Sequence, residues 1–173
     1  MPGFTLLELA VVMFIMGLVL LIAMPYFGGF KNTLLKSEAR RLAGRSNYLY
    51  EEAGAQKVIL RLNFDLDGNS YFVTRLDPLA ARPAFRPETG PAGGRILLPA
   101  GVRLRDVWVE GAGSFRRGTI GTQFYPGGAV DATVIHLAAS SGAQMTLSVD
   151  PASGHVAIAN GYLALQNAVA AAQ

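Results

Sequence analysis

The chain has 173 residues, enough for one modest domain and an additional N-terminal segment. Its 15 basic and 12 acidic side chains give a formal net charge of +3, which permits an anionic partner without implying one. The absence of cysteine excludes a disulfide framework, a cysteine-based zinc site and a thiol nucleophile. Charge is unevenly distributed, because residues 4–24 carry only Glu8 and every Lys and Arg comes after Phe30.

The apolar stretch of residues 4–24 is the first predicted element. As a helix it would be about 31 Å long, which matches the roughly 30 Å hydrocarbon core of a bilayer. Its Leu, Ile, Val and Phe residues after position 8 favour insertion by roughly 3 to 6 kcal/mol in total. Glu8 opposes insertion by at most about 3 kcal/mol, and less because it lies near the membrane edge. The stretch is therefore predicted to be a transmembrane helix.

Three ordinary interpretations of this stretch explain it less well. A cleaved secretory signal needs a basic start and small residues at its cleavage site, and both are missing here. A buried helix of a soluble domain is rarely so long and so apolar. A plain membrane anchor leaves Glu8 unexplained, since a carboxylate inside an apolar span marks a functional position.

Gly3 and Phe4, with Glu8 as the fifth residue counted from Phe4, resemble the class III signal of type IV pilins and pseudopilins. The resemblance implies that a prepilin peptidase cuts between Gly3 and Phe4 and methylates the new N-terminal residue, Phe4. It also implies that Glu8 pairs with the N-terminal amine of a neighbouring subunit. Such a pair would fix subunit register, because a buried carboxylate is costly alone and favourable beside a cation. The leader, residues 1–3, lacks the basic residue that is usual in this family.

Gly17 and Pro25 fall where pilin anchors commonly carry a glycine and a proline. The resemblance implies that the helix melts in this region when a filament assembles, and Pro25 alone predicts a bend or loosening just before it. An incidental small residue and a membrane-exit kink are the alternatives. The basic residues after the span would by themselves predict an inverted topology. The motif instead places the C-terminal domain outside the cytoplasm.

Residues 25–54 are predicted to continue the helix in amphipathic form. Apolar or small residues recur every three or four positions, which favours packing on a sheet. This stripe consists of Leu35, Ala39, Leu42, Ser46, Leu49 and Ala53. The charged residues off the stripe are predicted to face solvent; they are Arg40, Arg41, Arg45, Glu51 and Glu52. Gly54 is the predicted end of the helix.

Residues 55–160 are predicted to form a β-domain, because the apolar period changes to two. The resemblance to pilins places this domain in the periplasm. Residues 57–64 and 70–76 form a predicted hairpin around Asp67-Gly68-Asn69. Further strands are predicted at 95–98, 102–109, 120–125, 132–137, 144–149 and 155–159. The Pro-rich segment 77–94 and the Gly-rich segment 110–118 are predicted loops, and the Ala-rich tail 161–173 has no assigned role. The fold class is α+β, with a long N-terminal helix packed on an antiparallel sheet or sandwich.

Two turn regions of the β-domain, residues 124–128 and 149–156, resemble the C-terminal domain of the H-type minor pseudopilin family of the type II (general) secretion pathway. The resemblance implies a structural, non-enzymatic subunit near the tip of a periplasmic pseudopilus that drives protein export. It implies a single-pass inner-membrane location, with other pseudopilins and the prepilin peptidase as partners. A minor pilin of a type IV pilus or DNA-uptake system and a membrane-tethered binding module are the alternatives. The absence of cysteine favours the pseudopilin, and Glu8 argues against the binding module.

The sequence contains no recognisable catalytic or metal-binding constellation, so an enzyme and a cofactor are not expected. The two histidines, His136 and His155, fall on different predicted strands with no third ligand nearby. Asp65, Asp67 and Gly68 are similar to the start of a calcium loop, but the downstream glutamate is missing and a hairpin turn explains them better. A basic patch for nucleic acid is conceivable, but scattered surface arginines without interleaved aromatic residues are the preferred interpretation. The arginines concerned are Arg103, Arg105, Arg116 and Arg117.

Overall fold

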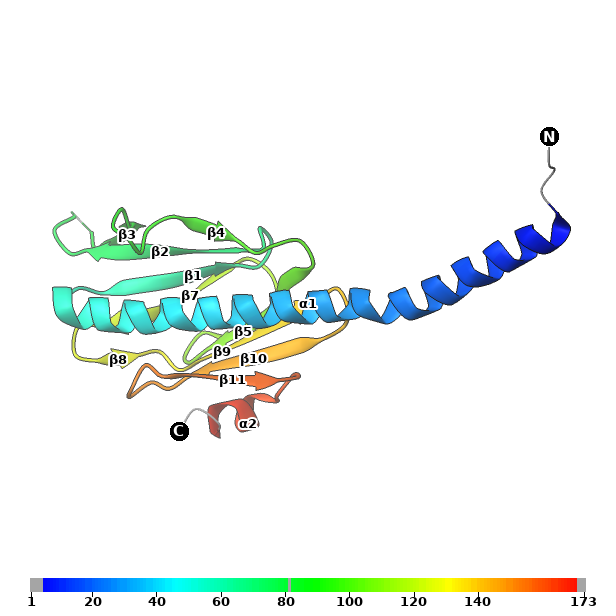
Figure 1. Ribbon diagram of the computed structural model, residues 1–173. Coiled ribbons are helices and arrows are strands. Elements are labelled where there is room, and N and C mark those ends of the chain that lie inside the picture. Colours follow the sequence, from blue (N-terminus) through cyan, green and yellow to red (C-terminus); the bar gives the residue numbers. More distant parts are fainter. Residues whose placement is uncertain (1–4, 81, 171–173) are drawn as a thin grey trace.

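The computed structural model describes residues 5–80 and 82–170, except for the side chains of residues 21–32. One helix, α1 (Leu6–Gln56), runs from the N-terminal end of this part into a β-domain, and its first half projects from the domain (Figure 1). The predicted α+β class is confirmed. Residues 1–3 and Phe4 lie outside the described residues, so the leader and its cleavage site have no structural account. Among the described residues, no helical segment has both the length and the apolarity needed to cross a membrane.

The β-domain consists of two antiparallel sheets. In the first sheet the strands follow the order β3-β2-β1-β7-β8, and β4 also pairs with β2. Its strands are β1 (Leu60–Asp65), β2 (Ser70–Asp77), β3 (Ala84–Pro87), β4 (Arg95–Leu97), β7 (Thr119–Tyr125) and β8 (Ala129–Val130). The second sheet has the order β11-β10-β9-β5-β6. Its strands are β5 (Val102–Val109), β6 (Gly113–Phe115), β9 (Thr133–Ala139), β10 (Gln144–Val149) and β11 (Val156–Asn160).

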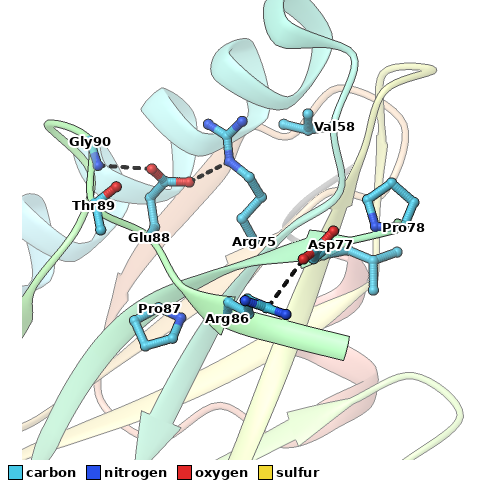
Figure 2. Close-up of a pocket in the computed structure, with 10 residues that line it drawn as sticks. Val58, Arg75, Asp77, Pro78, Arg86, Pro87, Glu88, Thr89 and Gly90 are labelled. Carbon is cyan, nitrogen blue, oxygen red and sulfur yellow. Dashed lines mark hydrogen bonds and ion pairs between the residues drawn. The ribbon is translucent and has the colours of Figure 1, made fainter. Parts of the chain in front are cut away.

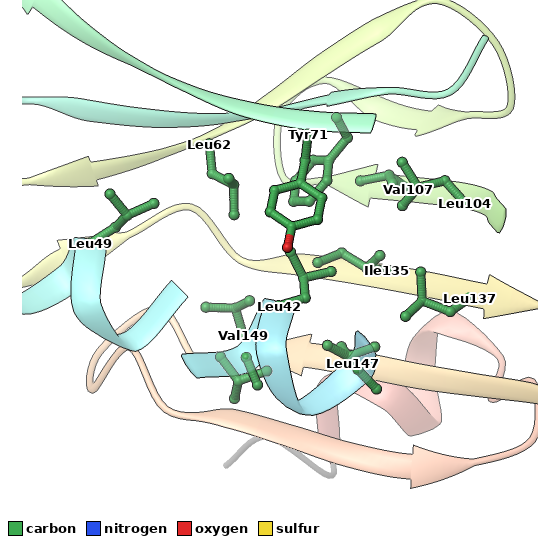
Figure 3. Close-up of a cluster of buried hydrophobic side chains, with 14 of the residues drawn as sticks. Leu42, Leu49, Leu62, Tyr71, Leu104, Val107, Ile135, Leu137, Leu147 and Val149 are labelled. Carbon is green, nitrogen blue, oxygen red and sulfur yellow. The ribbon is translucent and has the colours of Figure 1, made fainter. Parts of the chain in front are cut away.

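The second half of α1 packs on both sheets and closes the core between them (Figure 3). All six residues of the predicted stripe are buried, which confirms the amphipathic reading of this half. Leu42 and Leu49 of this stripe lie in one core cluster with Leu62 and Tyr71 of the first sheet and with Ile135, Leu147 and Val149 of the second. Fully burying a leucine side chain contributes about 1.5 to 3 kcal/mol, so the stripe accounts for much of the attachment between helix and sheets.

The end of α1 differs from the prediction. The helix continues past Gly54 to Gln56, and Lys57 closes it in the left-handed conformation at φ 54°. The Lys57 and Val58 N–H groups both donate to the Ala53 carbonyl, so backbone hydrogen bonds satisfy the helix end without a glycine there. The prediction that Arg45 faces solvent is also wrong, because its side chain is half-buried. Its guanidinium donates to the Ala92 and Gly93 carbonyls and so ties the Pro-rich segment to the helix.

The hairpin of β1 and β2 agrees with the sequence, and its turn also joins the two sheets. Leu60, Leu62 and Phe64 all face the core, as their alternation predicted. Asn69, in the left-handed conformation at φ 45°, donates to the Val102 carbonyl and accepts from the Leu104 N–H. The side chain of Asn69 therefore makes two hydrogen bonds that join the first sheet to β5 of the second sheet.

Two segments that were predicted to be loops contain strands. β3 lies within 77–94 and pairs with the outer side of β2, and β6 lies within 110–118 and pairs with β5. Pro87 is compatible with β3 because an edge strand has free N–H positions. Arg61 lies over the Phe85 ring at 3.5 Å, and Arg86 pairs with Asp77 at 3.1 Å. Contacts between distant segments thus order β3, and the local sequence carries no strand signal for it.

The tail forms a short helix, α2 (Leu165–Ala170), on the outer face of the second sheet. Thr146 of β10 donates to the Gly161 carbonyl and accepts from the Leu163 N–H. His136 of β9 stacks on Tyr162 with ring centroids 3.9 Å apart, and its Nε2 lies 3.0 Å from the Leu163 carbonyl oxygen. Residues 161–170 therefore cover polar groups that would otherwise open to solvent on this face.

Candidate functional site

The start of α1 is built by a helix cap. Thr5 is the N-cap, and its hydroxyl accepts a hydrogen bond of 3.2 Å from the Glu8 N–H. Thr5 and Glu8 have the spacing of a capping box, in which a glutamate sits at the third helical position. Glu8 is exposed, and its carboxylate has no ion pair within the part of the chain that the structure describes. The cap therefore uses the backbone of Glu8 and leaves its carboxylate available for another partner.

The side chains around Glu8 are apolar and uncovered. Leu6 is 89 % exposed, Phe14 is 70 % exposed and Met13 is 69 % exposed. Every described side chain of residues 5–20 is exposed, whereas the same helix buries its stripe from Leu35 onward. An apolar surface of this extent marks an interaction with lipid or with other proteins. In the described part of the chain, residues 5–20 of α1 are thus left uncovered, whereas the stripe from Leu35 onward is buried.

Gly17 lies within this exposed half, and a Cβ added there would meet nothing within 4 Å. No internal packing accounts for the glycine, so a close approach by another helix stays a prediction. α1 is helical through Pro25, whose side chain lies outside the described residues. The proposed melting at Gly17 and Pro25 during assembly likewise stays a prediction.

Tyr50 of α1 brings together the two turns that carry the H-type resemblance. Its hydroxyl oxygen lies 2.8 Å from the Gly128 carbonyl oxygen and 3.1 Å from that of Ala152, so its one proton can be donated to either. Gly154, at φ +67°, is so close that a Cβ there would lie 2.3 Å from the Tyr50 ring. The Val130 N–H also donates to the Pro151 carbonyl at 3.1 Å. The two sequence motifs are therefore one docking site for the end of α1.

The two histidines have different surroundings, one buried and one exposed. His136 is buried, and its Nδ1 is 2.6 Å from Asp106 Oδ1, so both of its ring nitrogens face oxygen acceptors. His155 is exposed before β11. His136 is a satisfied core histidine that holds the tail, and sequence reasoning missed this role because Asp106 and Leu163 are distant in the chain.

A hollow beside the C-terminal end of α1 contains two pairs of opposite charges among its lining residues (Figure 2). Arg75 Nε lies 2.6 Å from Glu88 Oε2, and the Gly90 N–H donates to Oε1 of the same carboxylate at 2.8 Å. Burial raises the pKa of Glu88, but the hydrogen bonds from Arg75 and Gly90 outweigh it and hold the pKa below its usual value. The geometry is that of an ordered loop, with each carboxylate committed to a structural bond.

The acidic turn at Asp65 and Asp67 is likewise committed to structure. Asp65 accepts from the Gly68 N–H and from Arg95, and these two bonds, in that order, hold its pKa below the usual value. Asp67 Oδ2 accepts from the Gly118 N–H at 2.9 Å and so joins the β1–β2 turn to the start of β7. Both carboxylates thus act as hairpin-turn acceptors.

The sequence suggested that four arginines are scattered over the surface. In the structure, Arg103, Arg105, Arg116 and Arg117 all line one hollow of about 540 Å³. Arg103 and Arg105 come from β5, and because they are two residues apart on the strand they lie on the same, exposed side. Arg116 and Arg117 come from the loop before β7. The earlier expectation is therefore wrong, because the β1–β2 turn and two separate segments of the second half of the chain converge here.

The start of the chain and its fold are each similar to known proteins. Residues 2–24 match the prokaryotic N-terminal methylation motif. No curated protein matches the chain. Two solved structures of the minor pseudopilin EpsH from the type II secretion system of Vibrio cholerae match its fold. One is 14% identical with a TM-score of 0.55, covering 73% of this chain and 96% of EpsH. The other is 16% identical with a TM-score of 0.58, covering 78% and 99%.

The chain thus combines a methylation motif at its start with a fold similar to that of a minor pseudopilin. Its β-domain resembles that of an H-type minor pseudopilin, as the two turn regions predicted. At these identities the likeness to EpsH is a likeness of fold.

Proposed function

We propose that the chain is a structural minor pseudopilin of a type II secretion system that assembles near the tip of the periplasmic pseudopilus. The observation that carries this proposal is the union of the methylation motif over residues 2–24 with a β-domain of EpsH-like fold. A prepilin peptidase would cut after Gly3 and methylate Phe4. The uncovered apolar half of α1 would anchor the protein in the inner membrane, with the β-domain in the periplasm.

Assembly would use the exposed half of α1, and recognition of neighbours would use the β-domain. Glu8 would pair with the Phe4 amine of an adjacent pseudopilin, since its carboxylate is left free by the Thr5 cap. A helix with an uncovered apolar surface can bury it against other such helices once it leaves the lipid. In this role the protein is not an enzyme and binds no cofactor.

Deletion of the gene is expected to reduce the export of folded substrates of a type II system into the medium, and expression of the intact chain in trans should restore it. Pilus-dependent motility and DNA uptake should continue in the deletion strain. Normal export together with lost pili or lost DNA uptake would instead support the alternative, a minor pilin.

A further inference from the structure

The basic end of the β-domain is the strongest unexplained feature of the surface. We define it as the end formed by Lys36, Arg103, Arg105, Arg116 and Arg117, all of them exposed. Within the described ranges, no hydrogen bond or ion pair joins the side chains of Lys36, Arg103, Arg116 or Arg117 to another residue. Arg105 is partly engaged, through Gln144 at 2.6 Å, Asp106 at 3.7 Å and the Tyr162 ring, whose centroid lies 4.7 Å from the guanidinium carbon. Several cations thus face one hollow with no acid committed to them.

The acids near this end are fewer than its cations. Asp65 is bound by Arg95, and Glu38 is buried beside Arg41. Asp67 lines the same hollow and accepts from the neutral Gly118 N–H, so its formal charge offsets one of the four arginines there. At the opposite end of the domain, acids accompany the basic side chains. Those acids are Glu51, Glu52, Asp77, Glu110, Asp131 and Asp150. The domain therefore has its positive charge concentrated at one end.

The basic end is also the end at which α1 enters the domain. Gln144, which binds Arg105, lines a second hollow together with Leu35 and Lys36, and Leu35 is the first buried residue of the described stripe. Figure 1 shows the turn between β1 and β2 at the same end, where the first half of α1 leaves the domain. The cations and the uncovered apolar helix thus face the same way.

We propose that the basic end binds the anionic phospholipid headgroups of the membrane that anchors α1. The proposal rests on the membrane anchoring proposed above. A basic residue close to an anionic bilayer surface contributes an attraction of about 1 kcal/mol. No ring contact brings an aromatic side chain to Arg103, Arg116 or Arg117 in the described chain, so base stacking with nucleic acid is not favoured over contacts to headgroup phosphates.

The reach of the helix permits this contact. From residue 24 to Leu35 an α-helix spans about 16 Å, and the headgroup layer occupies roughly 5 to 7 Å of it. The remaining gap is about one Debye length at physiological salt, so attraction is felt before contact. Gly28 and Gly29 lie in this interval, and each weakens the helix by about 1 kcal/mol relative to alanine, which makes a tilt of the domain toward the surface inexpensive.

The test uses the full chain in vesicles and exploits its lack of cysteine. Ala100→Cys places a single fluorophore on the exposed turn beside Gly101, whose carbonyl accepts from the Ser140 N–H at the basic end. Ala152→Cys places one at the far end. Energy transfer to acceptor-labelled headgroups is compared between phosphatidylcholine vesicles and vesicles that also contain phosphatidylglycerol. Flotation of the protein with the vesicles measures anchoring separately.

Phosphatidylglycerol should raise energy transfer from position 100 more than from position 152, and salt of about 1 M, where the Debye length is about 3 Å, should abolish the increase. Arg116→Gln/Arg117→Gln should lower the ratio of docked to free domains by roughly one order of magnitude or more, at about fivefold per charge. Lys57→Gln/Arg82→Gln removes two exposed charges away from the basic end; it is the matched control and should keep the increase.

The inference would be overturned if energy transfer from position 100 were the same in neutral and anionic vesicles. It would also be overturned if the control variant lost as much energy transfer as Arg116→Gln/Arg117→Gln. In both cases flotation with the vesicles would still support the membrane anchor. Failure of the chain to float with either kind of vesicle would overturn the proposed membrane anchoring itself. The two failures are therefore distinguishable in one experiment.

Discussion

Glu8→Ala is expected to leave the protein in the membrane fraction but to reduce its recovery in sheared pseudopilus filaments at least a hundredfold. The substitution removes the only charge of residues 4–24, so insertion becomes easier. It also leaves the Phe4 amine of the neighbouring subunit without its counter-ion in an apolar helix bundle. Breaking a buried ion pair by removing one partner costs about 3 to 5 kcal/mol, which corresponds to a loss of two or more orders of magnitude in affinity.

Thr5→Ala is the matched control for a simple helix-end effect. The Thr5 hydroxyl accepts from the Glu8 backbone N–H, so Glu8→Ala keeps this cap and Thr5→Ala removes it. Loss of an N-cap costs about 1 kcal/mol and should lower incorporation far less. Quantitative immunoblots of the filament and membrane fractions measure both variants. Undiminished incorporation of Glu8→Ala into filaments would contradict the pairing role. If both variants lost the same amount of incorporation, the effect of Glu8 would be explained by the helix cap alone.

Gly154→Ala is expected to destabilise the β-domain by about 3 kcal/mol. The residue is at φ +67°, and a left-handed conformation costs a residue with a Cβ about 1 to 2 kcal/mol. The added Cβ would also lie 2.3 Å from the Tyr50 ring, and overpacking of this kind costs about 1 to 3 kcal/mol more. The end of α1 would be displaced from the two turns that it now joins.

Gly111→Ala separates these two terms, because its φ is +76° and an added Cβ would meet nothing within 4 Å. Gly111→Ala should lower the free energy of unfolding by only about 1 kcal/mol, which is the cost of the left-handed conformation alone. Chemical unfolding in detergent, followed through the single tryptophan, Trp108, measures both variants. In a Tyr50→Ala background the extra cost of Gly154→Ala should disappear. The same cost for both glycines, or an extra cost that persists without Tyr50, would show that Tyr50 does not constrain this turn.

The long helix and the first strand could be predicted from the sequence, because in both the spacing of apolar residues matches the residues that are buried. The stripe from Leu35 to Ala53 has the helical period and packs on the sheets, and Leu60, Leu62 and Phe64 have the strand period and face the core. The turn at residues 67–69 follows from glycine and asparagine, which tolerate left-handed conformations. In each case the residues that specify the element are close together in the chain.

The features that the sequence did not reveal depend on partners distant in the chain. β3 is ordered by β2 and by Arg61, and the half-buried Arg45 donates to the carbonyls of a segment almost fifty positions away. The tail is held by Thr146 and His136, whose partners could be identified only once β9 and β10 were side by side. The hydropathy of a short segment gives no indication of such contacts.

The candidate site divides in the same way. Glu8 stands out in the sequence because one carboxylate in an apolar stretch is energetically unusual. The convergence of residues 124–128 and 149–156 on Tyr50 does not, since Pro-Gly and Ser-Gly turns occur in many β-proteins. The four arginines could be named from the sequence, but only the folded chain brings the start of β5, the loop before β7 and the β1–β2 turn together around one hollow.

The N-terminus of the mature protein tests the central proposal most directly. Mass spectrometry of the chain extracted from membranes of cells that contain a prepilin peptidase should show the loss of Met1 to Gly3 and a single methyl group on the amine of Phe4. The same protein from cells without the peptidase should keep residues 1–3 and carry no methyl group. An intact or unmethylated N-terminus in the presence of the peptidase would contradict the proposal that this chain is processed and assembled as a pseudopilin.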